Sequence, residues 1–308
     1  MRFLRENASA GSRRVCGPRY VQPTENDPIA IHEWPPMNDR FSENHESLEM
    51  RKSAGASNTE LERFRFEIDE IDNEICSLLE KRFSAVEHVR SAKSAHGQAS
   101  PIRPAREFAI LRRLAGRPDR LVSPELKVRL WRIIMSASTL SQASVTIHMS
   151  ATIAESVPFR LLIQEHYASF PVMVHQDDGH ALACVGADAA GLCIVTPNSS
   201  WAGAFLAGEA GEARIMGCLP LVRGAEMPEL LILGHGEPEA TGQDETILIG
   251  KSKLPETSAS WQIASGDVYV TSYSGFHLNP DRFNVAPANA ANVVRIAGYC
   301  SRLAGARP

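Results

Sequence analysis

The sequence predicts a multidomain protein: an all-α three-helix domain, then an α/β domain, then a small α+β unit. Three observations support this prediction. Apolar residues recur at helical spacing from Leu61, short apolar runs alternate with turn residues from Val145, and 308 residues suffice for two or three domains. We place the segments at residues 1–55, 56–143, 144–240 and 244–308.

The composition excludes several classes of protein. A net charge of −4 argues against nucleic-acid binding, and no window approaches the ~18 apolar residues of a membrane span. The six cysteines are widely spread and form no CxxC pair, so neither zinc nor a disulfide framework is indicated. The N-terminus lacks the apolar core of a secretory signal. We therefore expect a cytoplasmic protein that binds no membrane, nucleic acid or metal.

Residues 1–55 lack sustained periodicity and are rich in Pro, Asn, Ser, Glu and Arg. This composition predicts a disordered extension. Met37 and Met50 are alternative start positions, in which case part of the extension is not made.

A long helix is predicted from Leu61 to about Ala95, where neither Gly nor Pro interrupts the chain. Its apolar positions include Ile68, Ile71 and Ile75. The helix is far longer than the average of about 12 residues. It needs a partner helix to cover its apolar face, most simply from a second copy of the chain.

Two shorter helices follow. The first is predicted from Pro104 to Leu114, with proline at a tolerated early position. The second opens with Ser123-Pro124-Glu125, a capping serine followed by proline and an acid, and runs to about Ala143. From Val145 the alternation of strands and helices predicts the α/β domain. Residues 244–308 are expected to close with a helix over 289–303.

Polar residues interrupt the pattern that packing of the three helices requires. Arg82 and Lys93 lie 11 residues apart, which places them within about 20° of one face and about 16 Å apart along the axis. Ser138 and Gln142 lie four residues apart on the third helix. Each residue alone fits a solvated or helix-packing role, but together they predict a pocket for a small dicarboxylate, whose reaction requires charge stabilisation.

Four stretches then carry a resemblance over about residues 61–143: RFEIDEIDNEICSLLEKR, VRSAK, PAREFAILRRL and WRIIMSASTLSQ. They resemble the all-helical chorismate mutases of the AroQ type. The resemblance implies a homodimer of three-helix protomers with paired long helices. It also implies the rearrangement of chorismate to prephenate in aromatic amino acid biosynthesis, without a cofactor or a covalent intermediate.

The resemblance implies seven catalytic positions: Arg65, Arg82, Lys93, Arg106, Glu107, Ser138 and Gln142. Arg65 would reach into the partner's site, and it and Arg82 would bind substrate carboxylates. Lys93 and Gln142 would hydrogen-bond the ether oxygen.

Of the remaining positions, Arg106 would support the ionic network, Glu107 would hold the ring hydroxyl, and Ser138 would seat a carboxylate. Many members carry Asp three residues before the Arg-Glu pair, where this chain has Arg103. Either Glu107 works alone, or Arg103 turns outward.

The second half resembles in part a prephenate dehydratase followed by an ACT domain. This resemblance is carried by the stretches GADAAGLCIVTPNSS, ELLILGH with DETILIG, and GYCSRL. The dehydratases have a Thr-Arg-Phe catalytic motif, but the matching place in this chain reads MPELLIL. We therefore expect a shortened, non-catalytic region with a structural or regulatory role. The alternatives are a bifunctional mutase–dehydratase and a non-enzymatic regulatory protein that keeps the helical fold.

Overall fold

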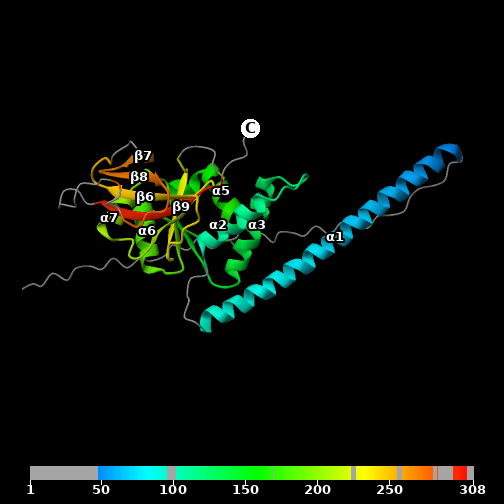
Figure 1. Cartoon of the computed structure of the whole chain (residues 1–308), viewed down its shortest axis with the longest axis horizontal. Helices are drawn as coiled ribbons and strands as arrows, with labels where there is room; N and C mark the ends of the chain where they lie inside the picture. Colours follow the sequence, from blue (N-terminus) through cyan, green and yellow to red (C-terminus); the bar gives the residue numbers. More distant parts are fainter. Residues whose placement is uncertain are drawn as a thin grey trace, which may run out of the picture. The chain divides into compact units, whose positions relative to one another are not determined.

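The computed structural model describes residues 48–95, 102–168, 170–222, 227–254, 259–279, 283 and 294–303 (Figure 1). The chain divides into two compact units, residues 1–88 and residues 89–308, which are described separately. The predicted disordered extension lies outside the described residues up to position 47.

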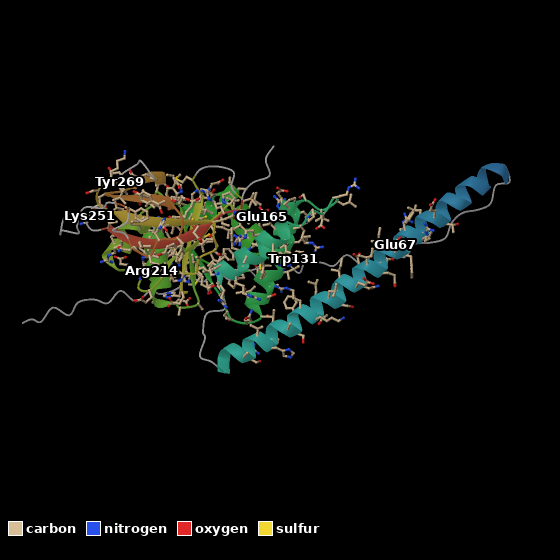
Figure 2. All side chains as sticks on the ribbon, in the orientation of Figure 1. Glu67, Trp131, Glu165, Arg214, Lys251 and Tyr269 are labelled. Atoms are coloured by element: carbon tan, nitrogen blue, oxygen red, sulfur yellow. The ribbon has the colours of Figure 1, made fainter. Side chains whose placement is uncertain are left out.

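Helix α1 spans Leu48–Ala95, 48 residues or about 72 Å of helix. It begins 13 residues before the predicted start at Leu61, so residues 48–55 of the predicted extension are helical. The physical reason is that no proline interrupts residues 48–60, so every backbone N–H can join the helix although the apolar repeat is missing. Side chains are described for residues 59–92, and Figure 2 shows them projecting around the helix. We find no helix among the described residues that could span a bilayer.

Helices α2 (Pro104–Ala115) and α3 (Pro124–Leu140) pack against each other in the second unit. Proline occupies the first turn of both helices, and the Ser123 hydroxyl accepts a hydrogen bond from the Leu126 backbone N–H at 3.2 Å. Helix α3 ends before the predicted Ala143. Its last turn tightens there, since the N–H of Gln142 bonds to the carbonyl of Thr139.

After α3, the described strands form one nine-stranded sheet in the order β2-β1-β3-β5-β4-β9-β6-β8-β7. Figure 1 labels the last four of these, β9, β6, β8 and β7. Strand β1 is parallel to both neighbours, and β5 runs antiparallel between β3 and β4. The strands are β1 Ile147–Ser150, β2 Val172–His175, β3 Leu192–Val195, β4 Arg214–Leu219, β5 Leu230–Gly234, β6 Asp244–Gly250, β7 Ala259–Ser265, β8 Val268–Ser274 and β9 Val294–Ser301.

Helices cover both faces of the first half of the sheet. They are α4 Ala151–Glu155, α5 Val157–Tyr167, α6 Asp178–Ala187 and α7 Trp201–Ala207. One core contains Leu182 of α6 and Trp201 of α7, and the other contains Ile153 of α4 and Ile163 of α5. Helix α3 packs against α5, so the helical segment continues into the α/β region.

The two predicted domains at 144–240 and 244–308 share this sheet. The connection is the parallel contact of β4 with β9, where Ile215 pairs with Gly298. Gly298 has φ +144°, and a Cβ there would lie 2.1 Å from the Ile215 carbonyl oxygen. Only glycine permits so close a backbone approach.

The predicted closing helix over 289–303 is wrong where the structure describes it, because residues 294–301 form strand β9. The segment carries the β-branched and aromatic residues Val294, Ile296 and Tyr299, which favour a strand. Residues 289–293 lie outside the described residues.

A third core joins the helical segment to the chain that follows β9. Phe108 and Leu111 of α2 pack with Val128 and Met135 of α3, and Leu303 belongs to the same cluster. The Leu303 N–H donates to the Leu221 carbonyl at 2.8 Å. The core of α2 and α3 is therefore completed by residues far along the sequence.

A buried ion pair lies near this end of the chain. Arg302 Nη2 lies 2.8 Å from Glu245 Oε1, and both side chains are almost fully buried. Ser272 and Trp261 donate hydrogen bonds to the other carboxylate oxygen. Burial by itself raises the pKa of Glu245, but hydrogen bonds from Arg302, Ser272 and Trp261 outweigh burial and hold that pKa below its ordinary value.

Candidate active site

Glu107 lies in the first turn of α2, where the helix dipole favours an acid. Its carboxylate accepts a hydrogen bond from Arg132 Nη1 of α3 at 2.6 Å. The Arg132 side chain is 5% exposed and that of Glu107 is 20% exposed. A charged pair this short and this buried fixes the orientation of the carboxylate.

The carbonyl and side chains at the end of α5 complete the surroundings of Arg132. Its Nε donates to the His166 carbonyl at 3.1 Å, and its guanidinium lies 5.6 Å from the Tyr167 ring centroid. Burial, together with the Arg132 charge, lowers the pKa of His166 well below its ordinary value. Burial also raises the pKa of the Tyr167 hydroxyl. Both side chains are therefore neutral near pH 7, and the Arg132 charge is balanced by Glu107.

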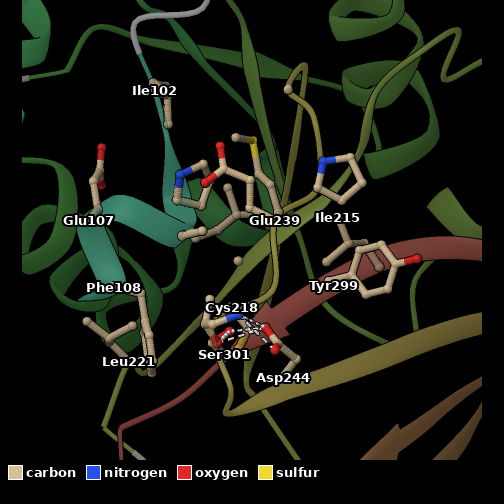
Figure 3. A pocket seen from close by; sticks show the side chains of 18 of the residues that line it. Ile102, Glu107, Phe108, Ile215, Cys218, Leu221, Glu239, Asp244, Tyr299 and Ser301 are labelled. Carbon is tan, nitrogen blue, oxygen red and sulfur yellow. Dashed lines mark hydrogen bonds between the residues drawn. The ribbon is translucent and has the colours of Figure 1, made fainter. Parts of the chain in front are cut away.

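A cavity of about 90 Å³ opens beside this pair (Figure 3). Glu107 and Phe108 of α2 line one side, while Asp244, Tyr299 and Ser301 of β6 and β9 line another. The Asp244 carboxylate accepts hydrogen bonds from the hydroxyls of Thr241 and Ser301. The predicted catalytic glutamate thus shares a cavity with residues of two interior strands of the sheet, β6 and β9.

The other predicted residues of α2 and α3 do not line this cavity. Arg106 is exposed on α2. Ser138 is buried, and its hydroxyl donates to the Ile134 carbonyl of its own helix at 2.7 Å. Gln142 Nε2 donates to the Ser138 carbonyl at 2.9 Å. The structure therefore brings Ser138 and Gln142 together at the end of α3, at a place separate from the Glu107 cavity.

Three predicted residues lie on α1. Arg65 is exposed and pairs with Glu62 one turn earlier at 3.0 Å. Arg82 is half-buried, and burial lowers the pKa of its guanidinium. Lys93 lies within the helix, but its side chain is outside the described residues.

Arg103, directly before α2, and Arg112 of α2 bind the loop that precedes β6. Arg103 Nη2 lies 2.5 Å from Glu239 Oε1, and Arg112 Nη1 donates to the Thr241 carbonyl at 2.8 Å. Arg103, at the position where the family often carries Asp, faces the loop at residue 239. Its charge is paired there with an acid of the second half of the chain.

Arg132 is not among the site residues predicted from the sequence. A signal was present, because Arg132 follows Val128 by four residues and precedes Met135 by three, which places it on the buried face of α3. A cation on an apolar helix face requires an anionic partner, and Glu107 is that partner.

Comparison with known proteins identifies the helical segment. Residues 64–143 match the family model described as chorismate mutase type II. The chain therefore contains a chorismate mutase type II domain, and the match supports an isomerase of this kind. The matched segment contains all seven predicted catalytic positions. No curated protein and no solved structure matches the chain.

Proposed function

We propose that the protein converts chorismate to prephenate, in the cytoplasm and without a cofactor, as a step of aromatic amino acid biosynthesis. The observation that carries this proposal is the match over residues 64–143, which spans Arg65, Arg82, Lys93, Arg106, Glu107, Ser138 and Gln142. The reaction needs no nucleophile. It requires fixed donors and cations that hold a flexible dicarboxylate in its reactive conformation.

In the proposed mechanism, Arg65 from one protomer and Arg82 from the other bind the substrate carboxylates. Lys93 and Gln142 donate to the ether oxygen, where negative charge develops as the C–O bond breaks. These donors stabilise the polarised transition state more than the substrate, which is the condition for catalysis. Ser138 seats a carboxylate, and Arg106 supports the ionic network.

Glu107 holds the ring hydroxyl of the substrate in this proposal. The short contact with Arg132 supports that role. It holds the Glu107 carboxylate in one orientation, so that the carboxylate can accept the hydrogen bond of a substrate hydroxyl from a defined direction. Arg103 has no part in this site, since it pairs with Glu239. Glu107 thus acts without a second acid from that position.

We propose that the protein is a homodimer joined through α1. Phe64, Ile68, Ile71, Ile75 and Leu78 follow one another at intervals of four, three, four and three residues, and all are between 45% and 62% exposed. This spacing is typical of a helix seam that packs against a second helix. The next position in this series, four residues after Leu78, is Arg82. Arg82 would therefore lie on the same face of α1 as the seam, where it could bind the substrate.

The second half of the chain has a non-catalytic, structural or regulatory role in this proposal. Support comes from its contacts with α2 and the residue before it. These are the Arg103–Glu239 ion pair, the Arg112 bond to Thr241, and Leu303 in the helical core. A conformational change in the loop before β6 would therefore alter contacts of α2, the helix that carries Glu107.

The purified full chain, supplied with chorismate, provides the test. Chorismate should disappear and prephenate should accumulate. Lys93→Ala should lower kcat/KM by at least about 10²-fold, the effect of losing one charge-stabilising donor. Arg106→Ala should also lower the rate, while Arg113→Ala, an exposed arginine on the same helix, should leave it unchanged.

The outcome of this assay distinguishes the three functions. Absence of chorismate turnover would overturn the mutase proposal and favour the non-enzymatic protein. Formation of phenylpyruvate above the uncatalysed rate would identify a bifunctional mutase–dehydratase. A near-normal rate for Lys93→Ala would show that the site is misplaced.

A further inference from the structure

Three metal-ligating side chains, none of which lines the Glu107 cavity, gather on the first half of the sheet. His148 lies on β1, His175 ends β2 and Cys184 lies on α6. One ligand atom from each lies within 4.8 Å of the others. We propose that this cluster binds a divalent transition-metal ion, Zn²⁺ by its nitrogen and sulfur ligands.

The strand register brings the two histidines to one side of the sheet. Ser150 of β1 is the partner of His175 in β2, and His148 lies two positions before Ser150, so it faces the same way. His148 Nδ1 lies 2.9 Å from His175 Nε2, and the two rings are stacked with centroids 5.1 Å apart. Two nitrogens that face each other at this distance can be bridged by one ion after a small rotation.

Helix α6 supplies the thiol from above this side of the sheet. Cys184 Sγ lies 3.9 Å from His175 Nδ1. Tetrahedral zinc separates neighbouring nitrogen and sulfur ligands by about 3.3–3.6 Å, given metal–ligand bonds of 2.0–2.3 Å. The two separations involve different nitrogens of His175, and one ion would take only one of them. With one ligand atom from each residue the three atoms lie within 4.8 Å of one another, and rotation of the side chains would bring them to the separations of a zinc site.

A buried nitrogen of His148 gives an independent indication. His148 is 5% exposed, and its Nε2 makes no hydrogen bond. Asp188, at the end of α6, places Oδ2 3.6 Å from that nitrogen. Metal-bound histidines commonly direct the second ring N–H to a carboxylate, which fixes the tautomer and leaves the first nitrogen free for the metal. Asp188 stands in that position.

A fourth ligand can come from His180 or from water. His180 precedes Cys184 by one helical turn and is exposed, and its ring centroid lies 5.9 Å from that of His175. Three protein ligands with one further position are sufficient for zinc. This site could not be predicted from a motif, because its ligands come from three elements that are distant in sequence. The proposal departs from the expectation that the chain binds no metal, and the titration below decides between the two.

The experiment uses the full chain, treated with a chelator and titrated with Co²⁺ as a spectroscopic substitute for Zn²⁺. We expect one equivalent of Co²⁺ to give a thiolate-to-cobalt charge-transfer band and the visible bands of tetrahedral cobalt, both removed by Zn²⁺. Cys184→Ser should abolish the charge-transfer band. His148→Gln and His175→Gln should weaken binding, and Asp188→Asn should weaken it about 10- to 100-fold.

Two exposed residues of α1 provide controls, since Cys76→Ser and His88→Gln should bind Co²⁺ as the unchanged protein does. Far-ultraviolet circular dichroism checks that each variant folds. The titration of the unchanged protein decides the matter without any variant. A protein that shows no charge-transfer band, or a folded Cys184→Ser variant that keeps it, would mean that the cluster is only hydrogen-bonded and would overturn the proposal.

Discussion

Single residues set the electrostatics of α2 and α3. Arg132 is buried and contacts one carboxylate, one backbone carbonyl and one aromatic ring. Glu107 is the only anion among these contacts, so it serves both the fold and the proposed chemistry. Loss of its charge must therefore affect stability and activity together, which separates it from residues that act in catalysis alone.

Substitution Glu107→Gln tests this double role. Arg132 would keep a hydrogen-bond acceptor but lose its counter-charge, so the free energy of unfolding should fall by about 1–3 kcal/mol. The mutase rate should fall about 10²-fold with the loss of the fixed anion. Denaturant unfolding and chorismate turnover measure the two effects. Glu125→Gln, an acid in the first turn of α3, is the control and should change neither by a similar amount.

The buried pair of Glu245 and Arg302 predicts a pH dependence. The pKa of Glu245 is lower in the folded protein than its ordinary value of 4.5, so the unfolded chain binds a proton more readily. The stabilisation is therefore complete above about pH 4.5 and is lost as pH falls through the lower folded pKa. Thermal unfolding of the protein and of Glu245→Gln, followed from pH 7 to pH 3, should converge at low pH. Parallel curves would contradict the assignment.

At the scale of elements, α1 is the helix whose apolar face most needs a partner. Ile71 and Ile75 lie at the centre of the proposed seam and are about half exposed. The double substitution Ile71→Asp with Ile75→Asp should convert a dimer to a monomer, because four carboxylates would meet in the seam. Light scattering measures the mass. Glu74→Gln, an exposed change on the same helix, should leave the dimer intact.

Local sequence was sufficient to predict where the helices α2 and α3 of the mutase domain begin. It was less sufficient to predict the strands of the sheet. Ser123 with Pro124 set the start of α3, and Pro104 set that of α2, because capping depends on neighbouring residues. The placement of β9 depends instead on its pairing with β4 and β6, which are distant in sequence. The periodicity of residues 294–301 alone fits either element.

The candidate site divides in the same way. Ser138 and Gln142 lie one helical turn apart, and each bonds to a carbonyl four residues earlier. The partner of Glu107 depends instead on the packing of α2 against α3, which brings Arg132 to it. Arg103 illustrates the limit, since its ion pair with Glu239 joins residues 136 positions apart. Nothing within the helix indicates that partner.

At the scale of the whole molecule, the contact of β4 with β9 joins two groups of strands into one sheet. Gly298→Ala would place a methyl group against the backbone of Ile215, which cannot move aside as a side chain can. The free energy of unfolding should fall by about 3 kcal/mol or more. Gly266→Ala is the matched control, because Gly266 also has positive φ but has open space around it. A similar loss for both would indicate backbone strain alone.

The place of β9 in the sheet also has a consequence for a chain emerging from the ribosome. Strands β1 to β5 can pair early, and β6 to β8 can pair among themselves, but β9 lies between β4 and β6. Both of those strands keep an open edge until residue 301 has been synthesised, and open edges are prone to pair with other chains. Leu303 reaches the core of α2 and α3 later still. The proposed mutase domain, although encoded first, is therefore completed last.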